Sequence, residues 1–279
     1  MTQGRYSWLK SSDAEIASLR GQRETGGVLM VAGATAWLIH SVLMIAGLVA
    51  LLSARALGGG QSYLSVIPAL GAFAAATFAV LLAAFLFGTG IFVFQGGTIG
   101  FAFQDWTSAV SPSTQTKGKK AAILMMLYGT LGILVVGLII GVLFAPSNSG
   151  ADVVRASLYA ISALWITASI AVVIGGVYTS GFLEKLLLEV GGDETMSGAG
   201  FLTYTILNAV GTLLIAGPMV ALLSNPLPLE RVPLLPLLIG AVLEFAVVPI
   251  VGIVVFGLLI VNILRLRRLE PGPRVAGLR

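Results

Sequence analysis

The stretch Ala121–Phe144 reads AAILMMLYGTLGILVVGLIIGVLF, 24 consecutive residues without a charged side chain. A helix of about 20 apolar residues crosses the roughly 30 Å hydrocarbon core of a bilayer. Such a long uncharged run therefore predicts a helix that spans a membrane.

Five further stretches have the same character, and short polar or glycine- and proline-rich connections separate them. The sequence therefore predicts an all-α, polytopic integral membrane bundle of six transmembrane helices arranged as three hairpins. The six predicted spans are Gly26–Ser53, Tyr63–Phe94, Ala121–Phe144, Val154–Tyr178, Phe201–Leu223 and Val232–Ile263.

The overall composition agrees with a membrane protein. The chain is 57% hydrophobic and 10% charged, whereas a soluble domain has roughly 25% charged residues. The chain has no cysteine, which excludes disulfides, thiolate zinc sites and iron–sulfur clusters. Absent cysteine and sparse Asn and Gln fit a thermophilic host.

Lysine and arginine set the orientation, because they gather in cytoplasmic segments. With the N-terminus inside, the outer loops hold only Arg55, Arg155 and Arg231. The cytoplasmic segments then hold Arg5, Lys10, Arg20, Arg23, Lys117, Lys119, Lys120, Lys185, Arg265, Arg267, Arg268, Arg274 and Arg279. We therefore expect both termini in the cytoplasm, and the plasma membrane as the location.

Three regions follow from this orientation. Residues 1–25 form a cytoplasmic leader, in which Ser12 and Glu15 make a capping box that opens a short amphipathic helix. Residues 26–266 form the transmembrane domain. Residues 267–279 form a basic cytoplasmic tail.

Two ionisable residues, His40 and Glu244, lie deep inside predicted spans. A charge at the bilayer centre costs about 2.5–3.5 kcal/mol on insertion scales, so both are expected to face protein. Pro249 should kink the sixth span near Glu244, because it cannot hydrogen bond to the Phe245 carbonyl. Three interpretations stay open: two neutral packed side chains, a direct His40–Glu244 pair, and a transport role for Glu244.

Glycines mark two candidate helix-packing or hinge regions. Gly137 and Gly141 form a GxxxG pattern in the third span, and Gly88 and Gly90 lie near the cytoplasmic end of the second. Small residues let membrane helices approach closely. The alternative is local flexibility for gating.

The segment Phe182–Val190 (FLEKLLLEV) places most of its apolar residues on one side. We expect a helix along the inner membrane surface. Its charged residues Glu184, Lys185 and Glu189 are the candidate docking site for a cytoplasmic protein such as an ATPase.

Enzyme and metal signatures are missing from the sequence. It has no HExxH, no nucleophile elbow and no acidic or histidine-rich cluster. The basic runs are too weakly charged for direct nucleic-acid binding and are expected to contact anionic lipid. We expect neither catalysis nor a cofactor.

The layout resembles two groups of membrane proteins. Ser12, Glu15, Leu19 and Arg20, followed by Gly26-Gly27 and three glycine-rich hairpins, resemble uncharacterised archaeal six-span proteins, which implies no known activity. Ser111-Pro112-Ser113 with Gly118-Lys119-Lys120 is similar to the coupling loop of exporter-type ABC permease subunits. The apolar segment 96–105 departs from those permeases, which are charged there.

The sequence thus favours a non-enzymatic transport or translocation subunit that works with a cytoplasmic partner or other membrane subunits. A DNA- or protein-translocation machine belongs to this class. The alternative is a structural or assembly subunit of a larger membrane complex. A homo-oligomer stays open.

Overall fold

The computed structural model describes residues 13–56, 67–94, 112–144, 151–190, 197–224 and 234–268. These residues are helical throughout and include six helices long and apolar enough to cross a membrane. The predicted six-span helical bundle is confirmed. The helices are α1 (Asp13–Ala56), α2 (Ile67–Phe94), α3 (Pro112–Leu143), α4 (Ala151–Val190), α5 (Ser197–Ser224), α6 (Leu234–Val242) and α7 (Val248–Arg268), with the π-helical turn η5 (Leu243–Val247) joining the last two.

Apart from α2, the spans extend beyond their predicted bounds at the ends expected to be cytoplasmic. α1 runs without a break from Asp13, so the leader helix is an extension of the first span rather than a separate element. α3 begins at Pro112 rather than at Ala121. Proline suits the first helical position, since its fixed φ matches a helix and its missing N–H is not needed there. The turns that carry the resemblance to a coupling loop are thus helical from Pro112 onward.

One predicted element is wrong. Phe182–Val190 does not form a separate helix along the membrane surface but continues α4 to its end. Phe182, Leu183 and Leu186 are buried against the other spans. An amphipathic face at membrane depth can be buried by lipid or by protein, and here protein covers it.

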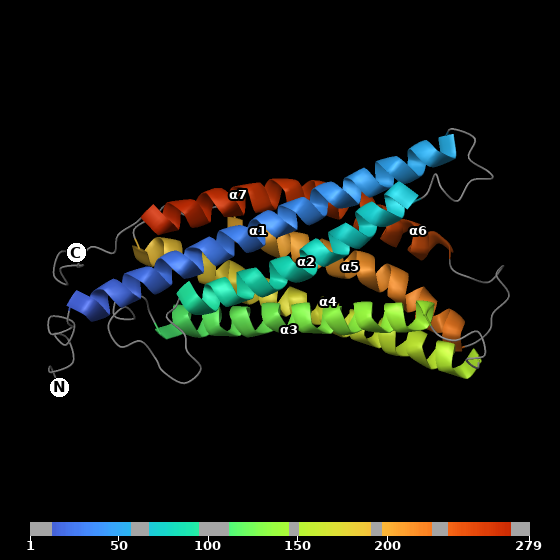
Figure 1. The fold of residues 1–279 in the computed structure, drawn as a ribbon, viewed down its shortest axis with the longest axis horizontal. Helices are drawn as coiled ribbons and strands as arrows, with labels where there is room; N and C mark the ends of the chain where they lie inside the picture. The colour runs from blue at the N-terminus through green and yellow to red at the C-terminus, as the bar shows by residue number, and fades with distance from the viewer. Residues whose placement is uncertain are drawn as a thin grey trace.

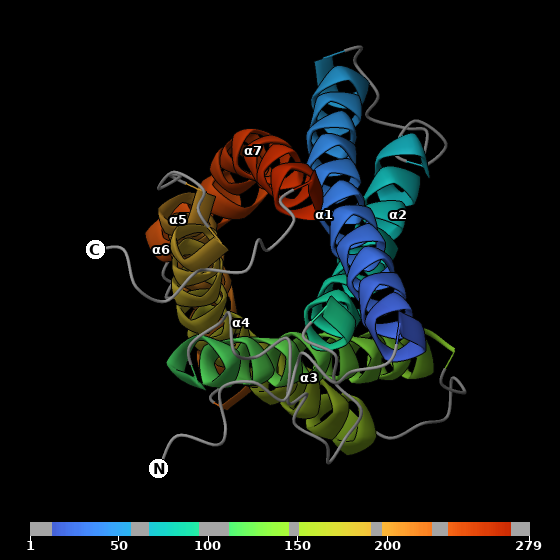
Figure 2. The same cartoon turned by 90° about the vertical axis from the view of Figure 1, so that its left-hand side faces the viewer.

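The spans form a ring. Each span packs against the next along the chain, and α7 closes the ring on α1. Figure 2 views this ring from the end where α1 begins and α7 ends. Figure 1 shows those helix ends on its left. Lys117, Lys185 and Arg265 lie at the ends of helices that meet this side, so the positive-inside rule predicts that this side faces the cytoplasm.

Glycines allow the close approach of neighbouring helices. A Cβ added at Gly90 of α2 would lie 2.6 Å from the backbone nitrogen of Met30 in α1. A Cβ at Gly88 would lie 3.0 Å from the Ala122 carbonyl oxygen in α3. α7 meets α1 where Gly252 contacts Ser41. Because glycine has no side chain, neighbouring helices approach closely at these positions, and this sets the distances between helices in the ring.

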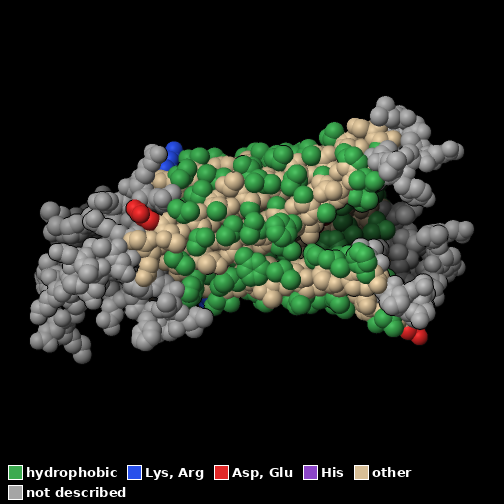
Figure 3. All heavy atoms as spheres, viewed as in Figure 1, with side chains coloured by type: hydrophobic (Ala, Val, Ile, Leu, Met, Phe, Trp, Pro, Cys, Tyr) green, Lys and Arg blue, Asp and Glu red, His purple; other side chains and the backbone are tan. Residues whose placement is uncertain are grey.

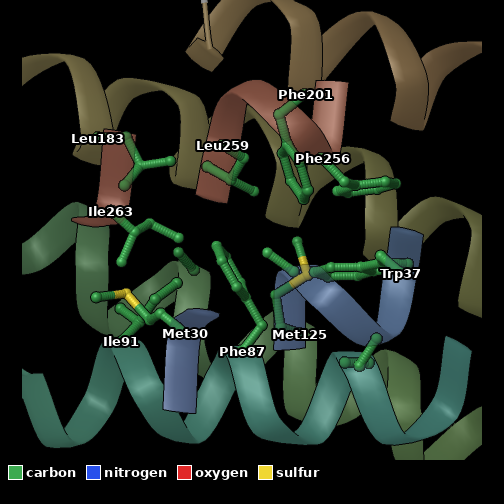
Figure 4. Close-up of a cluster of buried hydrophobic side chains, with 14 of the residues drawn as sticks. Met30, Trp37, Phe87, Ile91, Met125, Leu183, Phe201, Phe256, Leu259 and Ile263 are labelled. Atoms are coloured by element: carbon green, nitrogen blue, oxygen red, sulfur yellow. The ribbon is translucent and has the colours of Figure 1, made fainter. Parts of the chain in front are cut away.

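An aromatic cluster lies inside the ring, in the half of the molecule that includes the start of α1 and the end of α7. We call this the inner half and the opposite one the outer half. Figure 4 shows the side chains of the cluster. Trp37 of α1 stacks on Phe256 of α7 at 5.2 Å between centroids, and it meets Phe87 of α2 and Phe201 of α5 edge-on. Each of the remaining spans also sends side chains into this cluster. They include Met125 of α3 and Leu183 of α4.

The face of the ring seen in Figure 3 is apolar over its length, with charged side chains towards the two ends. The same view shows a hollow near its right-hand, outer end, between α2 above and α3 below. The buried cluster thus lies towards the left-hand end of this view, and the seam between α2 and α3 opens towards the right-hand end.

Candidate functional site

A π-helical turn shapes the sixth span beside its acidic residue. The Val248 N–H bonds to the Leu243 carbonyl, five residues back. Pro249 follows directly and cannot donate to the Phe245 carbonyl, as an α-helix requires. A kink was predicted beside Pro249; the structure has a π turn at this place, which shifts the register between α6 and α7. Such turns often occur at functional sites.

Glu244 lies inside this π turn and faces α5. Its Oε1 accepts a 2.7 Å hydrogen bond from the Thr212 hydroxyl. Gly211 makes room for it, since a Cβ there would lie 2.8 Å from the Glu244 Cγ. The carboxyl group is thus held against another helix, within the described span Leu235–Arg265.

The pair Glu244–Thr212 belongs to the ring interior. Thr212 follows Phe201 by 11 residues, about three turns, so both project from the same face of α5. Phe201 is part of the aromatic cluster, so Thr212 lies on the same side, closer to the outer end. The hydroxyls of Tyr128 and Tyr204 lie within electrostatic range of Glu244.

Tyr128 and Tyr204 join this polar group to the aromatic cluster. Tyr204 of α5 is buried and meets Phe256 edge-on at 4.7 Å. Tyr128 of α3 packs against the same cluster. The interior therefore changes, along its axis, from an aromatic inner half to a polar group around Glu244.

His40 lies elsewhere. Its Nδ1 is 2.9 Å from the Ala76 carbonyl oxygen of α2. Because a carbonyl can only accept, Nδ1 carries the proton of this hydrogen bond. His40 and Glu244 thus have different partners, which argues against the direct pair and for His40 as a link between α1 and α2.

The candidate glycines divide into two groups. Gly88 and Gly90 occupy close helix contacts, as a packing role requires. At Gly137 and Gly141 an added Cβ would meet nothing within 4 Å. Both follow the exposed stripe of α3 that includes Leu134, so this pair makes no helix contact among the described residues, and packing against another chain stays a prediction. The reason is that a GxxxG pattern identifies a smooth helix face without saying which helix meets it.

The candidate docking residues contact their own chain. Glu184 accepts a hydrogen bond from Ser180 at 3.4 Å. The Lys185 ammonium donates to the Ser113 hydroxyl at 3.3 Å, which joins the end of α4 to the start of α3. The Glu189 side chain lies outside the described side chains.

Sequence reasoning missed Thr212 and the two tyrosines. Tyr204, Gly211 and Thr212 share one face of α5, at spacings of seven and eight residues. This short polar stripe in an apolar span was the available signal. Within the described residues, no group of three His, Cys, Asp or Glu side chains could hold a metal ion.

Comparison with models of known families, with curated proteins and with solved structures found no match.

Proposed function

We propose that this chain is a non-enzymatic membrane transport or translocation subunit, with its path along the axis of the helix ring. The observation that carries the proposal is the Glu244–Thr212 pair inside the ring, between the aromatic cluster and the open outer half. Intramembrane acids that face a bundle interior commonly serve proton or ion pathways. A lone carboxyl group suits proton exchange best.

The described arrangement corresponds to a state closed towards the cytoplasm. Trp37, Phe87, Phe201 and Phe256 contact one another across the ring. On the outer side of this cluster, Ile139 follows Tyr128 by 11 residues, about three turns, and shares its inward face. Ile139 is nevertheless 41% exposed, so the interior beside this part of α3 is open.

A cytoplasmic partner completes the proposal. The turn of α4 that carries Glu184 and Lys185 also carries Phe182 and Leu183, which pack into the core. Movement of this helix end would reach the aromatic cluster through rigid, packed contacts. An ATPase docked here could open the inner half, as in a DNA- or protein-translocation machine.

The test is proton flux into liposomes that contain the purified chain and an internal pH dye, under a potassium diffusion potential. Because the aromatic cluster closes the path, we expect flux above that of empty liposomes when the co-purifying cytoplasmic proteins are present, and loss of this flux in Glu244→Gln. Thr212→Val should lower the flux, because it removes the hydrogen bond to Glu244. Thr203→Val is the matched control, since Thr203 is exposed on the same helix and bonds to the Ala199 carbonyl.

Flux equal to that of empty liposomes would contradict an autonomous path. If flux stayed absent after addition of the cytoplasmic proteins that co-purify with the chain, the transport proposal would fail.

The second candidate is a structural or assembly subunit. It is favoured by Gly137 and Gly141, which present a smooth, exposed helix face with open space above it. A helix of another subunit could approach this face closely. Because the chain has no cysteine, a Gly141→Cys variant can be tested for oxidative cross-linking to a neighbour without background. Gly257→Cys, on α7 and with equally open space, is the control.

A further inference from the structure

The seam between α2 and α3 is closed in its inner half. Gly88 meets Ala122, Gly129 meets the Phe85 ring, and Gly132 meets Leu81. These contacts follow one another along both helices, so they identify the face that each helix turns towards the other.

The same two faces separate in the outer half. Leu70 lies 18 residues before Gly88, about five turns, and therefore on the face of α2 that meets α3. Ile140 lies 18 residues after Ala122, on the face of α3 that meets α2. Leu70 is nevertheless 61% exposed and Ile140 49% exposed. The hollow at the outer end in Figure 3 lies between these two faces.

The walls of this hollow are apolar and belong to two helices long and apolar enough to cross a membrane. Leu70 belongs to the span Ile67–Phe94 and Ile140 to the span Ser113–Val142. Ile67 lies three residues from Leu70, and Ile133 lies seven residues from Ile140, so each shares the face of its neighbour. Both are exposed as well. Water in such a place would find few hydrogen-bond partners, and an apolar cavity stays dry. The surrounding solvent is the acyl chains of the bilayer.

We propose that the outer hollow between α2 and α3 is a lipid site that holds an acyl chain of an outer-leaflet phospholipid. The chain enters sideways from the bilayer, and its headgroup stays at the outer surface. This inference is independent of the transport proposal. It also gives the hollow a connection to Glu244, because Phe73 of α2 meets Phe245 of the π turn edge-on at 5.3 Å.

The first experiment uses the unaltered chain. It is reconstituted in bilayers of phosphatidylcholine that carries a photoactivatable diazirine near the end of one acyl chain. After illumination and extraction into detergent, mass spectrometry maps the cross-linked residues. We expect cross-links concentrated in residues 67–78 and 133–140. An even distribution along the lipid-facing stripe of α3, including Ile123 and Leu127, would overturn the proposal.

The second experiment fills the hollow. Ile140→Trp should reduce the phospholipid that stays bound to the purified chain in native mass spectrometry. Ile123→Trp is the matched control, because Ile123 is a similarly exposed isoleucine of α3 on its lipid-facing stripe. It should keep the wild-type amount of lipid. Size-exclusion chromatography checks that both variants remain folded.

Equal lipid retention in both variants would contradict a specific site. If the wild type were instead a dimer that Ile140→Trp dissociates, the hollow would hold a helix of a second copy, and the lipid proposal would be wrong.

Discussion

Glu244 is an acidic residue inside a membrane span, and its carboxyl group is hydrogen-bonded to a neighbouring helix. Its position inside a span required a protein partner, because lipid offers none, and the structure provides Thr212. The identity of that partner could not be predicted. It depends on how α6 and α5 are rotated about their axes, and the π turn before Pro249 changes that rotation without a signature in residue spacing.

Replacements of Glu244 test the hydrogen bond. Glu244→Gln keeps an oxygen that can accept from Thr212, so we expect a thermal stability close to that of the wild type. Glu244→Leu removes the acceptor and should lower stability by about 0.6 kcal/mol, the mean for interhelical hydrogen bonds in membranes. Thermal unfolding in detergent measures both. A larger loss of stability in Glu244→Gln than in Glu244→Leu would mean that the negative charge itself holds the helices together.

Thr179 offers a prediction of the opposite sign. Among the described side chains, its hydroxyl is the buried polar group without a hydrogen-bond partner. A buried unsatisfied group is costly, and valine has the same shape without the hydroxyl. We expect Thr179→Val to keep or raise the melting temperature. Thr167→Val, also on α4, should not raise it, because Thr167 already bonds to the Ala163 carbonyl. A marked loss in Thr179→Val would point to a bound water or ligand at this hydroxyl.

At the scale of elements, apolar length predicted the six spans well, whereas helix faces were harder to assign. The face of Phe182, Leu183 and Leu186 was expected on the bilayer surface and is buried in the core. Gly137 and Gly141 were expected in a helix contact and face open space. Both differences have one cause: lipid and protein interior are equally apolar, so composition cannot tell which of them covers a face.

The glycines turn this distinction into a matched pair of variants. Gly90→Ala places a Cβ against the Met30 backbone, which cannot move aside without separating α1 from α2. We expect a stability loss of about 1–3 kcal/mol, typical of overpacking. Gly137→Ala meets nothing and should gain up to about 1 kcal/mol from helix propensity. Thermal unfolding of both variants measures these two changes in stability. A loss at Gly137 as large as that at Gly90 would reveal an oligomeric contact on the exposed face of α3.

At the scale of the whole molecule, the order of spans around the ring follows from short connections, which place consecutive helices side by side. The closure of α7 on α1 was not predicted, since it depends on contacts between the two ends of the chain. Gly252 against Ser41 and Trp37 against Phe256 make this closure. It converts three hairpins into one ring with an interior, and the functional proposal depends on that interior.

The sidedness of the ring is the last prediction. α1 begins and α7 ends at the same end of the molecule, so a C-terminal reporter must report the side of the leader. Because lysines and arginines gather there, we expect alkaline phosphatase, which is active only outside, to be inactive when fused to the C-terminus. Fusions at Gly59 and Asn148, which lie outside the described residues, should be active, because they follow the opposite ends of α1 and α3. An active C-terminal fusion with inactive loop fusions would show that the protein has the opposite orientation in the membrane. The open half of the ring would then face the cytoplasm, and the proposed lipid would come from the inner leaflet.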